Sequence, residues 1–190
     1  AALEGAIAID PDFLPAYHWL ARLQLAHENT DAAIEQYRAM LDQDPNQAAP
    51  HMVLGHLFYL KQKYELAEKH YRAVLKENPA NFRAWNNLGL TEKIRGERKN
   101  AEKSFQKAIS LNPDYASAYG NLGTLYMENK EWEEALVEFT EALRIDPGGM
   151  IKLRIARARC LQRLNRLAEA EKELDKCPPA LRRAWIDEGH

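Results

Sequence analysis

The sequence repeats itself with a period of 34 residues. Segments Ala118–Pro147 and Ala84–Pro113 share Leu-Gly, then Ala, Phe, Ala and Pro at identical spacings. The same skeleton recurs twice more upstream. A fixed period of this length is typical of a repeat array, in which each unit packs on its neighbours. This feature restricts the fold more than any other property of the chain.

Each position of the repeat forms a column of similar residues. The first ring column holds Tyr17, His51, Trp85 and Tyr119. The leucine column and the small column follow as Leu20, Leu54, Leu88, Leu122 and Ala21, Gly55, Gly89, Gly123. The alanine column and the second ring column are Ala33, Ala67, Ala101, Ala135 and Tyr37, Tyr71, Phe105, Phe139. Each unit ends on a proline, namely Pro45, Pro79, Pro113 and Pro147.

The columns predict paired helices. Residues three and four apart share a helix face, so Tyr119, Leu122 and Gly123 form one apolar stripe. Ala135 and Phe139 form a stripe on the next helix. Gly or Ala in the small column lets two helices approach, and the Phe139 ring fills the space between them. We therefore interpret the rings as core residues rather than as a cofactor site.

These residues resemble the tetratricopeptide repeat, whose pattern is aromatic, Leu-Gly, aromatic, Ala, Phe or Tyr, Ala and Pro. The resemblance covers nearly the whole chain and implies an all-α fold, a right-handed superhelix of antiparallel helix pairs. Gln24 and Glu92 depart from the pattern, because Phe58 and Tyr126 provide a ring at that position.

We expect a single solenoid domain over residues 1–190. Its parts are an orphan second helix (1–11), four full repeats (14–47, 48–81, 82–115, 116–149), a degenerate fifth repeat (150–178) and a capping helix (179–190). The predicted helices are 1–10, 15–27, 31–43, 49–61, 65–77, 83–95, 99–111, 117–129, 133–145, 151–164 and 167–176. Gly148-Gly149 offsets the fifth unit by 35 residues, and Cys177 then falls in the column of Ala142.

The chain begins in the middle of a repeat. Leu3 and Ala6 lie 34 residues before Tyr37 and Met40, and the helix that should precede them is missing. We expect the chain to be a piece of a longer protein. The exposed edge of the first helix leaves homo-oligomer formation open.

Composition excludes several classes. The net charge of −2 argues against nucleic acid as the general partner. No apolar run is long enough to span a membrane, and no secretory signal is recognisable. Two cysteines, Cys160 and Cys177, are too few for a disulfide framework, and we interpret both as small core residues. They suit a reducing compartment, so the localisation is unknown with the cytoplasm favoured.

The sequence contains no catalytic constellation, so we expect no enzyme activity and no cofactor. It lacks a zinc-protease motif, a phosphate-binding glycine loop, a nucleophile elbow and paired CxxC motifs. His51 and His56 are five residues apart and lie on different helix faces, so we expect no metal site there.

The resemblance implies that the first helix of each pair lines a concave groove that binds a peptide or partner helix. The groove residues predicted on this basis are His18, Arg22, Leu25, Met52, His56, Tyr59, Asn86, Asn87, Leu90, Lys93, Asn121, Thr124, Met127, Ile155 and Arg159. The first half is apolar and aromatic, and the second half gains cations. We therefore expect a partner segment with apolar side chains at one end and carboxylates towards the other.

The main hypothesis is a non-catalytic scaffold or adaptor that binds another protein. One alternative is the substrate-recruiting arm of a larger enzyme, such as a glycosyltransferase, because Asn87 and Asn121 resemble two rungs of the asparagine ladder of O-GlcNAc transferase. Another is a helical-repeat RNA binder, which the charge disfavours. A chaperone-type carboxylate clamp is disfavoured too, since no frame of the groove columns supplies its Lys and Asn set.

Overall fold

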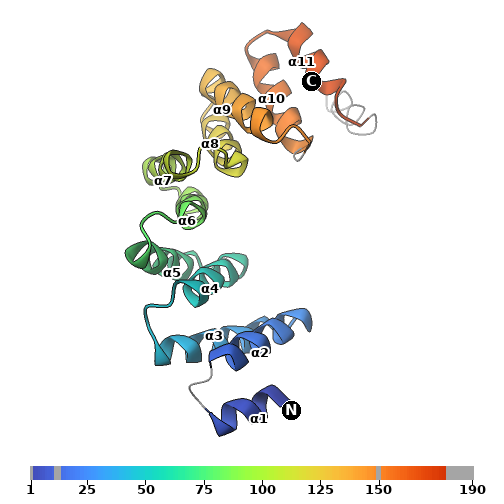
Figure 1. Cartoon of the computed structure of the whole chain (residues 1–190). Helices are drawn as coiled ribbons and strands as arrows, with labels where there is room; N and C mark the ends of the chain where they lie inside the picture. The colour runs from blue at the N-terminus through green and yellow to red at the C-terminus, as the bar shows by residue number, and fades with distance from the viewer. Residues whose placement is uncertain (1, 11–13, 149–150, 179–190) are drawn as a thin grey trace. The chain divides into compact units, whose positions relative to one another are not determined.

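The computed structural model describes residues 2–10, 14–148 and 151–178, and every regular element in these ranges is an α-helix (Figure 1). The chain divides into two compact units, Ala1–Arg95 and Gly96–His190, and each is described by itself. The predicted capping helix, 179–190, lies outside the described residues. The single continuous domain remains a prediction.

The helices agree with the predicted ranges within two residues at each end. Unit 1 contains α1 (Ala2–Ile9), α2 (Leu14–Ala26), α3 (Thr30–Gln43), α4 (Ala48–Leu60), α5 (Tyr64–Glu77) and α6 (Phe82–Ile94). Unit 2 contains α7 (Arg98–Leu111), α8 (Ala116–Glu128), α9 (Trp132–Ile145), α10 (Ile151–Arg163) and α11 (Leu167–Leu174).

Neighbouring helices pack as the repeat predicts. The pairs α2–α3 and α4–α5 form in unit 1, and α8–α9 and α10–α11 form in unit 2. Successive pairs also pack on each other, through α3–α4, α5–α6, α7–α8 and α9–α10. The boundary between the units falls inside the third repeat, 82–115, so the pairing of α6 with α7 stays a prediction.

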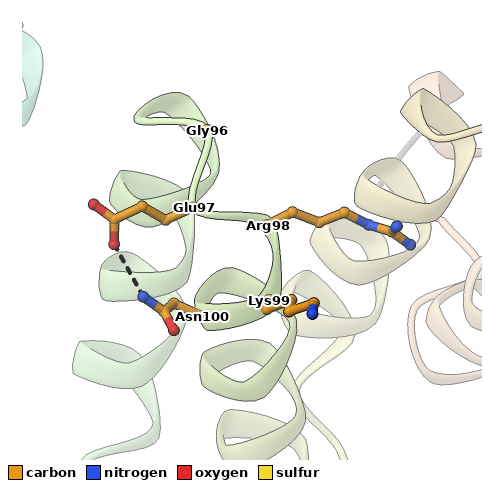
Figure 2. A pocket seen from close by; sticks show the side chains of 5 residues that line it. All are labelled: Gly96, Glu97, Arg98, Lys99 and Asn100. Atoms are coloured by element: carbon orange, nitrogen blue, oxygen red, sulfur yellow. Dashed lines mark hydrogen bonds between the residues drawn. The ribbon is translucent and has the colours of Figure 1, made fainter.

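The turn between paired helices has a repeated backbone conformation. One residue in each turn has a positive φ of 58° to 77°, namely Glu28, Gln62, Gly96, Lys130 and Asn165. After Glu28, Gln62, Lys130 and Asn165, the next residue donates its N–H to a carbonyl five residues back, as Lys63 does to Phe58 at 2.8 Å. Figure 2 shows this place in unit 2, where Gly96 precedes Glu97 and the Glu97–Asn100 side-chain hydrogen bond of 3.1 Å. Only glycine adopts this conformation without steric cost.

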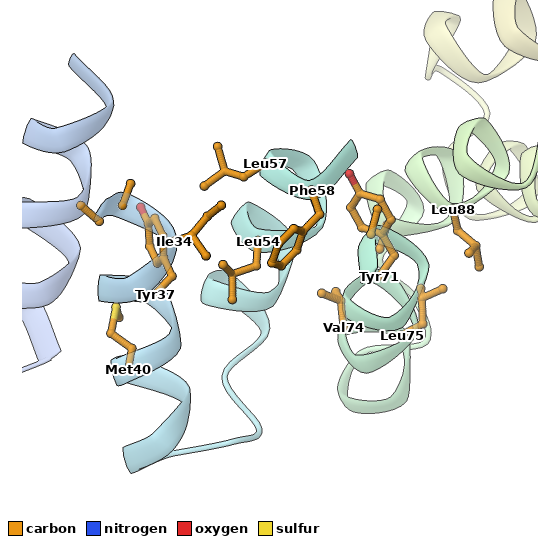
Figure 3. Close-up of a cluster of buried hydrophobic side chains, with 14 of the residues drawn as sticks. Ile34, Tyr37, Met40, Leu54, Leu57, Phe58, Tyr71, Val74, Leu75 and Leu88 are labelled. Atoms are coloured by element: carbon orange, nitrogen blue, oxygen red, sulfur yellow. The ribbon is translucent and has the colours of Figure 1, made fainter. Parts of the chain in front are cut away.

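The side chains of the second ring column lie in the core of each compact unit. Its rings are buried, and Figure 3 shows Tyr37 and Tyr71 among the apolar side chains of α3, α4 and α5. A Cβ atom at Gly55 would lie 2.7 Å from the Tyr71 ring, and one at Gly123 would lie 2.8 Å from the Phe139 ring. The prediction that the small column permits close helix approach is therefore confirmed.

Titratable side chains also occupy buried positions. Cys160 and Cys177 are both buried free thiols, as expected for small core residues, and burial raises the pKa of Cys160 to about 11. Glu92 is 2% exposed in a position where other units carry a ring, and its carboxylate accepts a hydrogen bond from Arg72 at 3.1 Å. A buried carboxylate needs such a partner, because burying it alone is very costly.

In three repeats, the residue of the first ring column bonds to the proline carbonyl that ends the repeat before it. Trp85 donates its indole N–H to the Pro79 carbonyl at 2.9 Å, and His51 Nε2 lies 3.0 Å from the Pro45 carbonyl. Arg154 donates to the Pro147 carbonyl in the same way. An imidazole and a guanidinium thus replace the indole as donor.

Residues of the first ring column also contact the second helix of their own repeat. His51 Nδ1 lies 2.8 Å from His70 Nδ1. Since the Nε2–H of His51 donates to Pro45, its Nδ1 accepts and His70 donates. In the fifth repeat, Arg154 and Arg157 both bind the buried carboxylate of Glu173. The sequence pattern does not reveal Arg154 as a member of this column, since its side chain is not a ring.

Candidate functional site

Unit 1 contains a pocket at the predicted groove. Its cavity has a volume of about 120 Å³ and is lined by His56 and Tyr59 of α4, Tyr71 of α5, and Asn87 and Leu90 of α6. Four of these five residues are predicted groove residues. The structure therefore brings together side chains that lie up to 34 residues apart in sequence, because α4 and α6 are in contact.

Tyr71 is the fifth lining residue, and its column predicted a core position and no place in the groove. Its side chain is 1% exposed, and burial raises the pKa of its phenol. The side chain of Asn87 acts in the opposite direction and lowers this pKa. The signal for this role was the hydroxyl itself, since Phe105 and Phe139 fill the same column in unit 2 without one.

The amide of Asn87 is held on both sides. Its Nδ2 lies 3.9 Å from the Met52 sulfur, and its Oδ1 accepts from Asn86 Nδ2 at 3.3 Å. Asn86 itself is only 3% exposed, so it supports Asn87 rather than lining an open surface. The predicted residue Met52 is half-buried and packs against the core.

The predicted residues of unit 1 differ in their exposure and contacts. His56 is exposed, Tyr59 packs against the core with its ring edge on Tyr64, and Lys93 is half-buried. In α2, Leu25 packs against the core. His18 contacts the Trp19 and Tyr37 rings at centroid distances of 6.3 and 6.0 Å, and the exposed Arg22 lies 5.1 Å over Trp19.

The helices that provide this surface are positively charged. Within α2, α4 and α6, the cations are Arg22, Arg83 and Lys93, and the carboxylate is Glu92. Because Glu92 is buried against Arg72, it adds no exposed negative charge. The exposed charge of these three helices is therefore positive.

The predicted residues of unit 2 do not form a comparable pocket with one another in the described part of the chain. Thr124 donates its hydroxyl to the Gly120 carbonyl at 2.7 Å, and Met127 packs against the core of unit 2. Asn121, Ile155 and Arg159 are half-buried. Their side chains contribute to helix packing as well as to the surface.

A second hollow lies between α1 and α2. It is lined by Leu3, Trp19, Arg22 and Leu23, and almost all of its surface is apolar. Leu23 is 48% exposed, whereas Leu57 and Leu125 in the same column are buried. An apolar surface is therefore exposed where α1 meets α2.

Comparison with known families decides the class of the chain. Models described as tetratricopeptide repeat match residues 1–57, 52–92, 82–115 and 116–148. The chain belongs to the tetratricopeptide repeat family. The fifth helix pair lies beyond the matched residues, and its Ala170 and Leu174 are buried.

Solved tetratricopeptide structures share this fold. A MamA protein is 23% identical, with 87% of this chain and 90% of that chain covered and a TM-score of 0.77. PilF of Pseudomonas aeruginosa is 21% identical, with 99% and 87% covered and a TM-score of 0.81. YrrB, described as a protein with an unusual peptide-binding site, is 20% identical, with 99% and 98% covered and a TM-score of 0.75.

No curated protein matches the chain by sequence. Among the described residues, no helix combines the length and apolarity that a membrane crossing requires.

Proposed function

We propose that this tetratricopeptide protein is a non-catalytic scaffold that binds a segment of another protein on the α2–α4–α6 surface of unit 1. The observation that carries the proposal is the pocket at Tyr71, where α4 and α6 present His56, Tyr59, Asn87 and Leu90 around one cavity. Concave sites lined by apolar groups with a few fixed polar groups are where ligands usually bind. YrrB, which shares the fold, is described as having a peptide-binding site.

A selection experiment tests this proposal. A displayed library of random peptides is selected on the intact protein, and the affinities of selected peptides are measured for the wild type and for Leu90→Phe, which fills the pocket. Val137→Phe on α9 is the matched control, because Val137 is 60% exposed on a second helix. We expect at least about tenfold weaker binding for Leu90→Phe and no change for Val137→Phe. Selected peptides that bind both variants equally well would contradict the proposal.

The RNA-binding alternative is tested in parallel. Nucleic-acid affinity comes largely from Lys and Arg side chains that neutralise phosphates, and α2, α4 and α6 supply Arg22, Arg83 and Lys93 for this purpose. We expect mixed RNA to bind weakly at physiological salt. Tight binding that falls steeply with salt would replace the protein-scaffold proposal.

The hollow between α1 and α2 supports a second proposal, which is self-association through this edge. Apolar patches that a protein leaves exposed are common association sites. Sedimentation velocity of the wild type and of Leu23→Glu tests it. We expect a concentration-dependent dimer that the substitution abolishes, and a wild type that stays monomeric at all concentrations would exclude it.

A further inference from the structure

We propose that the pocket at Tyr71 binds one aliphatic side chain of an internal protein segment, and that acidic residues of the segment on both sides of this side chain contact Arg22, Arg83 and Lys93. This inference rests on the proposed function of the same surface and adds the chemical class of its partner.

The size and chemistry of the pocket select the anchor. A cavity of about 120 Å³ has room for one side chain, and its walls are mostly apolar. The amide of Asn87 in its lining already has partners, because its Nδ2 contacts the Met52 sulfur and its Oδ1 accepts from Asn86. An apolar anchor leaves these bonds intact, whereas a charged anchor would lose its hydration without a counter-charge.

The charges around the pocket select the flanking residues. On α6, Arg83 lies seven residues before Leu90 and Lys93 three residues after it, so all three share one helix face. Arg22 of α2 occupies the column of His56, one repeat upstream. Along α6, cations therefore lie before and after Leu90, and the carboxylate of these helices, Glu92, is buried in its ion pair with Arg72.

This arrangement favours an internal segment over a chain terminus. A segment that crosses the surface meets positive charge before and after the anchor, whereas a C-terminal carboxylate would use one side only. Solvent-exposed ion pairs contribute little to affinity. The aliphatic anchor therefore sets most of the affinity, and the acidic residues set selectivity and association rate.

Synthetic peptides test the partner class. The probe is a short amidated peptide with one leucine between two glutamate pairs in a Gly/Ser background, and its binding is measured by fluorescence anisotropy. Replacing the leucine by serine should weaken binding about tenfold or more. Replacing the glutamates by glutamines should weaken it severalfold at low salt, with the difference shrinking as salt is added. A lysine version that binds as well as the probe would overturn the inference. So would tighter binding of a free-acid peptide that ends on the leucine.

Protein variants connect the peptide effects to the pocket. Leu90→Phe should abolish the difference between the leucine and serine peptides, and Lys93→Glu should reverse the preference for glutamate over lysine flanks. Val137→Phe and Lys76→Glu are matched controls on second helices, and thermal melts confirm that all variants are folded. Control variants that change the preferences as much as Leu90→Phe and Lys93→Glu do would overturn the inference.

The two proposals fail in different ways. If library-selected peptides depend on Leu90 but lack an aliphatic residue between acidic ones, the surface binds protein segments and the partner class is wrong. If the selected peptides bind independently of Leu90, both the proposed function and this inference are wrong.

Discussion

At the scale of single residues, the same backbone conformation is occupied by five different side chains. Glu28, Gln62, Gly96, Lys130 and Asn165 all have positive φ in the turn between paired helices. For an L-residue with a Cβ atom, this conformation costs about 1–2 kcal/mol. Four of the described turns therefore carry a residue with a Cβ atom, although glycine fits this backbone conformation best.

Replacing Gln62 by glycine should stabilise unit 1. Removing the strained Cβ gains more than the added entropy of the unfolded chain costs, so we expect a net increase of about 0.5–1 kcal/mol in the free energy of unfolding. Urea denaturation measures it. The reciprocal control is Gly96→Ala, which should lower the stability because Gly96 has φ of 77°. A less stable Gln62→Gly protein would contradict this account of the turn.

The small column makes a second prediction at this scale. Gly123→Ala places a Cβ atom about 2.8 Å from the buried Phe139 ring. Overpacking of this kind costs about 1–3 kcal/mol, and the better helix propensity of alanine returns about 1 kcal/mol of it. We expect a net loss of about 1 kcal/mol by chemical denaturation. Gly5→Ala in α1 is the control, because nothing lies within 4 Å of its added Cβ; equal effects at both sites would show that ring contact is not the reason for glycine.

At the scale of helix pairs, one column makes the two units respond differently to pH. The residue before the second ring is Gln36, His70, Ser104, Glu138 and, after the 35-residue offset, Glu173. His70 faces His51 across the α4–α5 pair, and Glu138 is influenced by Glu141 and lies near Tyr119. Each unit therefore contains a titratable group at a position where two helices meet.

Acid should weaken the α4–α5 pair. Burial, with additional effects of His51, Lys69 and Arg38, lowers the pKa of His70 from 6.5 to about 4. The folded state thus binds the proton less well than the unfolded state, so the stabilisation is complete above 6.5 and is lost as the pH falls towards 4. We expect His70→Gln, which copies Gln36, to melt several degrees higher than the wild type near pH 5 and similarly near pH 7.5. An equal difference in melting temperature between the two proteins at both pH values would exclude this role.

Base should weaken the α8–α9 pair. Burial, with the charge of Glu141, raises the pKa of Glu138 from 4.5 to about 7. Its contribution is complete below 4.5 and is lost as the pH rises towards 7, which is the opposite direction to His70. Glu138→Gln should therefore slow amide hydrogen exchange in α8 and α9 near neutral pH and change little near pH 4.5. Unchanged exchange at neutral pH would show that Glu138 is solvated.

The helices and the core were predictable because the 34-residue period fixes both. The alanine and second ring columns needed only spacing and residue size to identify them. Other positions could not be predicted from one column alone. His70 pairs with His51, which belongs to a different column. Arg154 donates to the carbonyl of Pro147, as a ring of its column does to the proline in an earlier repeat. In the site, the column pattern identified His56 and Leu90, but it gave no sign that Asn86 is buried or that Tyr71 reaches the pocket.

At the scale of the whole molecule, one architecture is used in two units with different surfaces. The first helices of unit 1 surround a pocket with exposed positive charge. In unit 2, α10 has basic residues and no acidic residue, and two of its arginines bind the buried Glu173. The family explains why both units fold, since each pair buries its apolar stripe on its neighbours. The differences between the two surfaces follow from side chains outside the core columns.

The central claim is that a protein segment binds at the pocket of unit 1, and methyl NMR tests it directly. Titration with the leucine–glutamate peptide should shift the methyl signals of Met52 and Leu90 in a saturable manner and leave those of Val137 and Leu167 unchanged. Shifts confined to Val137 and Leu167, with Met52 and Leu90 unaffected, would contradict the claim.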